Sequence, residues 1–158
     1  MSKSIFFVFF AVAIMGSAVI DSEAQIARKS VPASEVNGTF RHSFSGKFKG
    51  SSNDIKILAL GHGKLKVAFD LIYPFVVAGE LSANFGSAEG IATISGDTAV
   101  YRSSKFGPCA ITIKFIKPGT IKVTQEGTDF DCGFGHNVTA DGTYRKTSSE
   151  KPKFDTTN

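Results

Sequence analysis

A regular alternation of apolar and polar side chains constrains the fold of this chain more than any other feature of its sequence. In the run KLKVAFDLI, residues 64–72, apolar side chains occupy every second position from Leu65 to Leu71, and mostly charged residues lie between them. Successive side chains of a strand point to opposite faces, so this pattern predicts a β-strand with one buried face. No segment after residue 24 shows convincing helical periodicity, which favours an all-β protein.

Short segments rich in glycine separate the expected strands. DIKILAL and KLKVAFDLI flank a Gly-His-Gly sequence, and CAITIKF and TIKVTQE flank Ile-Lys-Pro-Gly; both arrangements predict β-hairpins. Gly86-Ser87 and Gly96-Asp97 are interpreted as further turns, which separate strands at GELSANF, GIATIS and TAVYRSS. Eight or nine strands joined by short loops predict a single antiparallel meander.

A closed or nearly closed barrel is the favoured form of this meander, with a two-sheet sandwich as the alternative. Closure removes the exposed strand edges that invite aggregation. The first expected strand begins Gly-Thr-Phe-Arg at 38–41 and the last begins Gly-Thr-Tyr-Arg at 142–145, a likeness that suits two neighbouring strands at a barrel seam. We expect the barrel domain to span residues 37–147.

The first 24 residues have the three-part pattern of a secretory signal peptide. Lys3 precedes an unbroken apolar run at 5–15, and Ser22-Glu23-Ala24 closes the segment with small residues at the cleavage positions. The apolar run is shorter than the ~20 residues of a membrane-spanning helix, although an uncleaved anchor is the alternative. We therefore expect a secreted or periplasmic protein without stable membrane insertion after cleavage. A flexible linker is expected at 25–36 and a disordered polar tail at 148–158.

The charge of the chain argues against nucleic acid as a partner. The formal net charge is +4, and loss of a segment that contains Lys3, Asp21 and Glu23 (net −1) raises it to +5. The cations are spread along the chain instead of forming the cluster that nucleic-acid binding requires. This mild positive charge favours acidic partners.

The sequence contains two cysteines, Cys109 and Cys132, and in a secreted protein the simplest arrangement joins them. The disulfide would close a loop of about 24 residues and contribute roughly 3 kcal/mol on the chain-entropy model. Their spacing differs from the C-x-x-C pairs of redox and zinc sites.

The residue types that enzymes use are present without the spacing that catalysis needs. The three histidines, His42, His62 and His136, form no H-x-x-x-H pair, so we expect no metal site. The sequence has no G-x-S-x-G nucleophile motif. Asp129 and Asp131 could face a sugar as a carboxylate pair, but their position in an expected loop favours simple solvent exposure. We therefore predict that the protein is not an enzyme and needs no cofactor.

The stretch CGFGHNVTADGTYRK, residues 132–146, supplies the candidate binding residues. The expected disulfide anchors it, its first glycines allow tight turns, and its end forms the last expected strand. Phe134, His136 and Asn137 have no structural role in this interpretation, so we assign them to an exposed binding loop. Asn137 also begins an N-x-T sequon, as does Asn37, which matters only in a eukaryotic secretory pathway.

The C-terminal half resembles a group of small secreted bacterial β-proteins. The resemblance covers about residues 80–146 and rests, in order, on SANFGSAEGIATISGDTAVY, PCAITIKF, TIKVTQEG and CGFGHNVTADGTYRK. The motifs of the group are a C-x-I-x-[IL]-x-F strand and a closing CGFG-x-NV-x-x-x-G-x-Y segment. The resemblance implies a secreted or periplasmic β-protein with one disulfide and supplies no catalytic residues. In architecture alone the chain is also similar to periplasmic lysozyme inhibitors, which are small exported β-barrels.

We expect a noncatalytic binding module outside the cytoplasm, with inhibition of a cell-wall-degrading enzyme as its specific form. A loop held by a disulfide binds a protein partner at low entropic cost because it is ordered in advance. The alternative is a carrier of a small apolar ligand inside the barrel. Of the fifteen phenylalanines, four lie in residues 1–24 and eleven remain, and an eight-stranded barrel can hold one small ligand. A hydrolase built on the loops is a third possibility.

Overall fold

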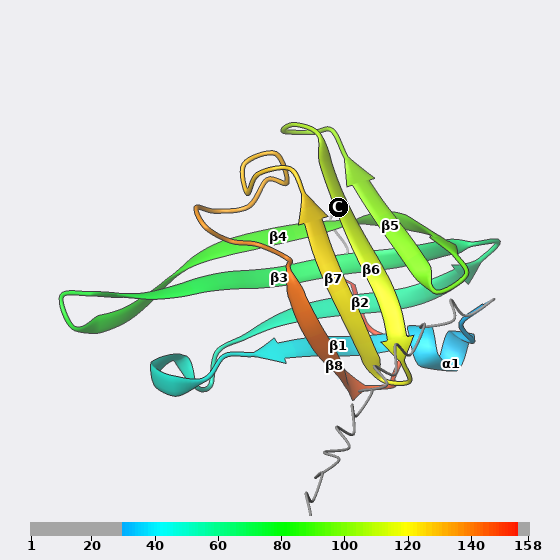
Figure 1. The fold of residues 1–158 in the computed structure, drawn as a ribbon, viewed down its shortest axis with the longest axis horizontal. Coiled ribbons are helices and arrows are strands. Elements are labelled where there is room, and N and C mark those ends of the chain that lie inside the picture. Colours follow the sequence, from blue (N-terminus) through cyan, green and yellow to red (C-terminus); the bar gives the residue numbers. More distant parts are fainter. Residues whose placement is uncertain (1–29, 155–158) are drawn as a thin grey trace, which may run out of the picture.

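Eight antiparallel strands form a closed barrel in the computed structural model, which describes residues 30–154 (Figure 1). The strands follow one another around the barrel in chain order, and the last pairs with the first. The all-β meander and its closure into a barrel are therefore confirmed. The strands are β1 (Gly38–Ser43), β2 (Ser52–Gly61), β3 (Lys64–Val77), β4 (Glu80–Ser95), β5 (Thr98–Ser103), β6 (Cys109–Lys117), β7 (Thr120–Glu126) and β8 (Gly142–Ser148). A short helix, α1 (Ala33–Val36), precedes them, and a 3₁₀ turn, η1 (Gly46–Phe48), lies between β1 and β2.

The barrel seam joins the two strands with similar sequences. β1 and β8 are antiparallel neighbours, with Phe40 opposite Lys146. The aromatic residues of the two tetrapeptides, Phe40 and Tyr144, are both fully buried. The likeness between the tetrapeptides therefore reflects neighbouring strands that each place one aromatic ring inside the barrel.

Alternate side chains of the strands fill the barrel interior. The apolar residues that alternate along β3, from Leu65 to Leu71, are almost completely buried. Their partners on β4 are small: Ala92, Gly90, Ala88 and Gly86. A Cβ on Gly90 would lie 2.8 Å from Cε2 of Tyr101, so the glycine makes room for that ring. Burial of one large side chain such as Phe69 contributes about 1.5–3 kcal/mol, so this interior is the main source of stability.

β4 is one continuous strand, which corrects the prediction of a turn at Gly86-Ser87. Both residues lie within the register that pairs β4 with β3, where Gly86 is opposite Leu71. The glycine provides space instead of a turn, because a Cβ on it would lie 2.8 Å from Cδ1 of Phe134. The turn predicted at 96–97 is confirmed between β4 and β5.

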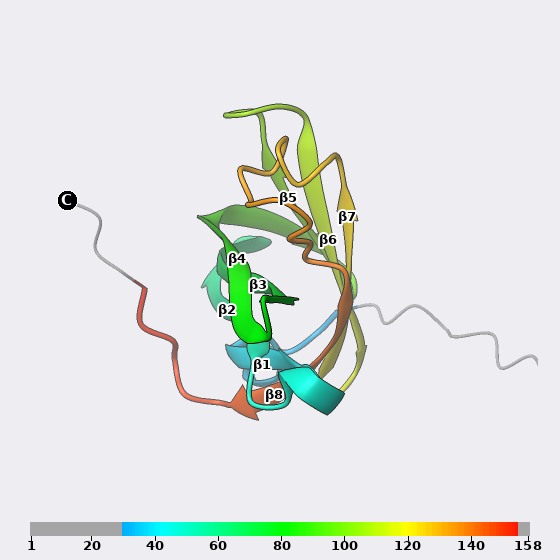
Figure 2. The ribbon, with the colours of Figure 1, turned by 90° about the vertical axis from the view of Figure 1, so that its left-hand side faces the viewer.

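The two longest strands extend beyond the barrel as a two-stranded ribbon. β3 has 14 residues and β4 has 16. β2 pairs with β3 only as far as Asp70, and β5 pairs with β4 only at 92–95. The remaining segment, residues 71–86, is here called the β3–β4 hairpin, and it projects from one end of the molecule (Figures 1 and 2). Ala78 and Gly79, with φ of 49° and 87°, reverse the chain at its tip.

The segment before the barrel is more regular than the flexible linker predicted at 25–36. Its last residues form α1, and Val36 is 2% exposed and packs into the core. Lys146 holds this segment to β8, because its Nζ donates hydrogen bonds to the carbonyl oxygens of Ser34 at 2.9 Å and Asn37 at 2.8 Å. The predicted signal peptide at 1–24 and the linker residues 25–29 lie outside the described residues.

The polar tail predicted at 148–158 begins at the last residue of the barrel. Ser148 is the last residue of β8, and Lys66 Nζ lies 4.6 Å from the ring centroid of Phe154. Residues 155–158 lie outside the described part of the chain. Between residues 30 and 154, no helix has the length and apolar character needed to cross a membrane.

Candidate functional site

Cys109 and Cys132 form the expected disulfide, with their Sγ atoms 2.02 Å apart. Cys109 begins β6, and Cys132 lies in the long connection between β7 and β8, residues 127–141, here called the clasp loop. The two cysteines are 23 positions apart in sequence, and a cross-link of this span contributes about 3 kcal/mol on the chain-entropy model. The disulfide therefore fixes the clasp loop to the barrel wall.

Phe134 of the clasp loop is buried, which corrects the prediction that it is exposed. Its side chain is 5% exposed and belongs to the core cluster. It forms an isolated β-bridge with Gly86, and the following residue, Gly135, donates its backbone N–H to the carbonyl oxygen of Phe85 at 2.9 Å. Phe134 therefore packs against β4 instead of facing a partner.

Asn137 and His136, the other two predicted binding residues, have different surroundings. Asn137 adopts φ of 62°, which asparagine tolerates better than most residues. Its backbone N–H donates to Oδ2 of Asp129 at 2.6 Å, so a structural role accounts for it. His136 has a side chain that is 78% exposed, with Nδ1 3.7 Å from the same Asp129 oxygen. Of the three predicted residues, His136 and Asn137 are therefore exposed, and Phe134 is not.

The two aspartates considered as a catalytic pair stabilise the clasp loop. Oδ2 of Asp131 accepts hydrogen bonds from the backbone N–H and the hydroxyl of Thr128, both at 2.8 Å. These two hydrogen bonds lower the pKa of Asp131, and the one from the backbone N–H has the larger effect. Oδ1 of Asp129 accepts from the backbone N–H of Phe130 at 2.8 Å. Both carboxylates are thus engaged by nearby donors of the loop, which argues against a glycosidase pair.

The three histidines lie in separate parts of the barrel. Nδ1 of His42 lies 3.0 Å from the carbonyl oxygen of Thr143, and its ring centroid lies 5.7 Å from that of Tyr144. His62 is exposed in the turn between β2 and β3. Throughout residues 30–154, no group of three histidine, cysteine, aspartate or glutamate residues could hold a metal ion.

Side chains occupy the barrel interior where the alternative function needs a ligand chamber. Tyr144, Phe40 and Phe69 are among the largest fully buried residues. The Tyr144 hydroxyl donates a hydrogen bond to the carbonyl oxygen of Ala140 at 2.9 Å, and burial raises the pKa of Tyr144. Five pockets lined by described residues are depressions that open to solvent. The carrier alternative therefore gains no support from the interior.

The β3–β4 hairpin carries an exposed apolar surface that the alternating pattern does not predict. Leu81 and Phe85 are 66% and 72% exposed, and the register puts them on the same side of the ribbon as Val76 and Pro74. Phe48 of η1 lies beside them, and a pocket of about 410 Å³ opens between η1 and the ribbon. The surface formed by these five residues is here called the hairpin face. The unbroken apolar run YPFVVA just before Gly79 is the sequence signal that points to it.

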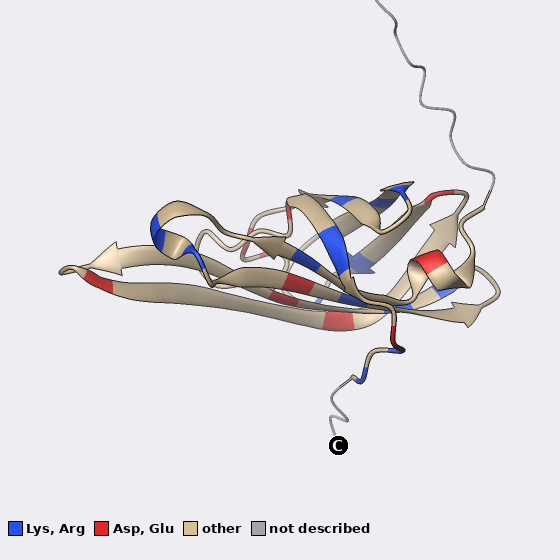
Figure 3. Ribbon diagram, turned by 90° about the horizontal axis from the view of Figure 1, so that it is seen from below, with Lys and Arg blue, Asp and Glu red and all other residues tan. Residues whose placement is uncertain are grey.

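Charge is sparse on the hairpin and present beside it. Residues 71–88 contain one charged residue, Glu80 near the tip, and the projecting ribbon is largely tan in Figure 3. Lys47 and Lys49 flank Phe48, and Lys47 Nζ lies 5.0 Å from the Phe48 ring centroid. An apolar surface bordered by cations complements a partner surface that is apolar at its centre and acidic at its rim.

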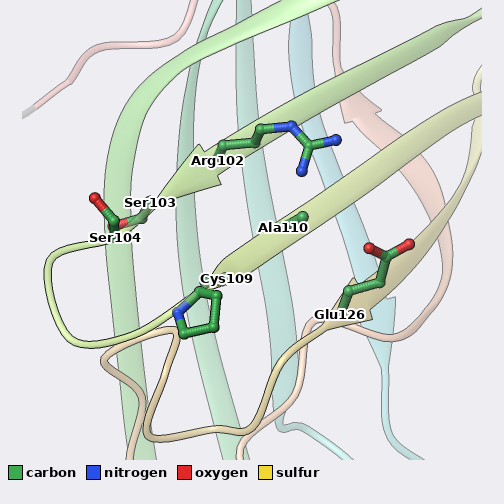
Figure 4. Close-up of a pocket in the computed structure, with 7 residues that line it drawn as sticks. Arg102, Ser103, Ser104, Cys109, Ala110 and Glu126 are labelled. Carbon is green, nitrogen blue, oxygen red and sulfur yellow. The ribbon is translucent and has the colours of Figure 1, made fainter.

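A separate depression lies on the outer side of β5, β6 and β7 (Figure 4). Its volume is about 390 Å³. Arg102 on β5 and Glu126 at the end of β7 rise on either side of Ala110 on β6. This depression, here called the Ala110 groove, is lined by Arg102, Ser103, Ser104, Pro108, Cys109, Ala110 and Glu126.

The chain matches no family model, no curated protein and no solved structure. The resemblance to small secreted bacterial β-proteins therefore stays a prediction.

Proposed function

We propose that this chain is a noncatalytic binding protein of the extracytoplasmic space that holds a protein partner through its hairpin face. The observation that carries the proposal is the projecting ribbon, which exposes Leu81 and Phe85 to solvent. Large contiguous apolar patches on soluble proteins mark interaction sites. Burial of one such side chain contributes about 1.5–3 kcal/mol, so a few of them can stabilise a complex.

The ribbon is also costly to maintain without a partner. A two-stranded hairpin alone is at best marginally stable in water, and each ordered residue loses about 1–2 kcal/mol of backbone entropy. Beyond residue 71, β3 pairs with β4 alone. A partner that covers the hairpin face would supply the apolar burial that the barrel does not.

The face of the ribbon is more accessible to a partner than either of its edges. On the β3 edge, Pro74 has no N–H to donate to an added strand. On the β4 edge, Asn84 Nδ2 donates to the carbonyl oxygen of His136 at 2.7 Å, and Gly135 donates to Phe85. The clasp loop and the proline thus obstruct strand addition, which leaves insertion of the apolar face into a cleft as the mode of contact.

The specific form we propose is inhibition of a cell-wall-degrading enzyme, with the hairpin in its substrate cleft. The predicted signal peptide and the disulfide support an extracytoplasmic location. Enzymes that cleave glycosidic bonds have two carboxyl groups beside the bond. Lys47 and Lys49, next to the hairpin face, would complement such an acidic cleft.

The test measures inhibition of purified peptidoglycan hydrolases by the chain that begins at residue 25. We expect the double variant Leu81→Ser/Phe85→Ser to inhibit at least about 100-fold more weakly, because each lost side chain removes about 1.5–3 kcal/mol of burial. Ile91→Ser is the matched control, since Ile91 is an exposed apolar residue of β4 within the barrel. Its effect should stay within about 3-fold, as expected for a residue outside the contact.

The proposal fails if no hydrolase is inhibited, or if the double variant and Ile91→Ser inhibit equally well. A third variant, His136→Ala, tests the loop predicted from the sequence. If His136→Ala is the only variant that loses inhibition, the enzyme contacts the clasp loop and not the hairpin face.

A further inference from the structure

The Ala110 groove combines two charged walls with a small floor. Ala110 is opposite Arg102 on one side and opposite Glu126 on the other. Directly paired residues of neighbouring strands point to the same face of a sheet, so all three side chains stand on the outer surface. Ala110 is nevertheless only 7% exposed. Its two taller neighbours therefore enclose it as the floor of a groove.

The charges of the two walls are held apart. The backbones of Arg102 and Glu126 are two strand spacings, or about 10 Å, from each other. Within residues 30–154, neither side chain takes part in a hydrogen bond or ion pair with another residue. Figure 4 shows both extending over the groove from opposite sides. The cation and the carboxylate are therefore both available to one ligand.

Other charged pairs on the outer surface of the barrel have a different arrangement. Arg41 on β1 binds Asp54 on the adjacent strand at 2.7 Å. Lys66 on β3 likewise binds Glu89 on the adjacent β4 at 2.8 Å. At the groove, Ala110 on β6 lies between the two charged residues, and the described structure shows no ion pair between them. This contrast distinguishes the groove from an ordinary salt-bridged sheet surface.

The groove is also rigid at one end. Cys109, next to Ala110, is fixed by the disulfide to the clasp loop. Pro108 has a restricted backbone, and Ser103 and Ser104 add hydroxyl groups to the lining. Groups that are fixed before binding lose less entropy when a ligand arrives.

We propose that the Ala110 groove binds a small zwitterion of about dipeptide size, with its carboxylate on Arg102 and its ammonium group on Glu126. A guanidinium binds a carboxylate through two parallel hydrogen bonds, and a carboxylate accepts hydrogen bonds from an ammonium group. The groove volume of about 390 Å³ accommodates a two-residue ligand. This site is independent of the hairpin face and goes beyond the proposed function.

The test uses alanyl-alanine as the probe, with N-acetyl-alanyl-alanine and alanyl-alanine amide as analogues that each lack one charge. Binding is followed by NMR shift changes of the Ala110 amide at low salt. We expect each analogue to bind about 10-fold more weakly than the zwitterion, the effect of losing one charge-assisted hydrogen bond. In Glu126→Gln, N-acetyl-alanyl-alanine should bind as tightly as alanyl-alanine, because no carboxylate remains to bind the ammonium group. In Arg102→Gln, alanyl-alanine amide should likewise bind as tightly as alanyl-alanine. Arg145→Gln is the control, because Arg145 is an exposed cation on β8. In this variant both analogues should still bind more weakly than alanyl-alanine.

Two results would overturn the site. The first is the absence of saturable shifts at Ala110 with millimolar alanyl-alanine. The second is a difference in affinity between alanyl-alanine and its analogues that is the same in Arg102→Gln and Glu126→Gln as in the unaltered chain. Since both residues are exposed, the amide spectra of the variants should show that the barrel remains folded.

Discussion

Phe134 of the clasp loop lies against Gly86 of β4, and this contact joins the disulfide-held loop to the strand that forms the hairpin. A Cβ on Gly86 would lie 2.8 Å from Cδ1 of Phe134 and 2.8 Å from Cγ1 of Val138. Beside the contact, Gly135 donates its N–H to the carbonyl oxygen of Phe85. The base of the hairpin is therefore held by the clasp loop as well as by β3.

Gly86→Ala should destabilise the protein, because the added methyl group has no space between Phe134 and Val138. We expect a loss of about 1–3 kcal/mol in the free energy of unfolding, as for other overpacked cores, measured by urea denaturation. Ser87→Ala is the matched control: Ser87 is the exposed neighbour, and the change there should stay within about 0.5 kcal/mol. Equal stability of the two variants would contradict the contact.

Phe134→Ala tests the burial of a residue that the sequence suggested was exposed. Loss of a buried phenylalanine side chain should lower the free energy of unfolding by about 3–5 kcal/mol. Phe130→Ala, in the same loop but with an exposed ring, should change it by no more than about 0.5 kcal/mol. If Phe130→Ala is the more damaging of the two, Phe134 is not a core residue.

Loss of the disulfide should weaken the whole barrel. Replacing both Cys109 and Cys132 with alanine should lower the free energy of unfolding by about 3 kcal/mol on the chain-entropy model. Thermal unfolding with and without a reductant provides the check. The reductant should lower the midpoint of the unaltered chain and leave that of the double variant unchanged; an unaffected midpoint in both would argue against a stabilising bond.

Stability should decline at high pH because Tyr144 is buried in its neutral form. Burial raises the pKa of Tyr144 above the ordinary tyrosine value of about 10. Above that value the unfolded chain loses the Tyr144 proton while the folded barrel retains it. The unfolded state then binds fewer protons, so the free energy of unfolding falls as the pH rises.

Tyr144→Phe isolates this contribution from other groups that titrate in the same range. The variant should lose about 0.5–1.5 kcal/mol near neutral pH, because the hydrogen bond to Ala140 is absent. Its stability should then fall less steeply than that of the unaltered chain between about pH 9 and about pH 11, around the ordinary tyrosine pKa. Equal slopes for the two proteins would contradict a buried, neutral Tyr144.

The sequence predicts the barrel well because its determinants are local. Alternation along residues 64–72 shows which side chains of β3 face the core, and that pattern depends on neighbours within one strand. The tetrapeptides at 38–41 and 142–145 predict the seam because neighbouring strands in equivalent positions face similar packing. The disulfide follows from the presence of only two cysteines in the chain.

The features that the sequence does not predict depend on contacts between distant segments. Gly86 resembles a turn residue, but it makes room for a ring in a loop that follows β7. Phe134 appears exposed in sequence because its partner on β4 is remote. The hairpin face depends on where β2 and β5 stop pairing with their neighbours, which is a property of register. His136 and Asn137 keep the exposed positions predicted for them, and Phe134 does not.

The measurement that tests the hairpin face most directly is hydrogen exchange on a complex with an inhibited hydrolase. Binding should slow exchange of backbone amides on the hairpin between Tyr73 and Phe85, because insertion into a cleft excludes water from the ribbon. Amides of the clasp loop at 128–137 and of the Ala110 groove should exchange at the same rate with and without the enzyme. Protection confined to the clasp loop, with unchanged exchange along the hairpin, would contradict the proposed mode of binding.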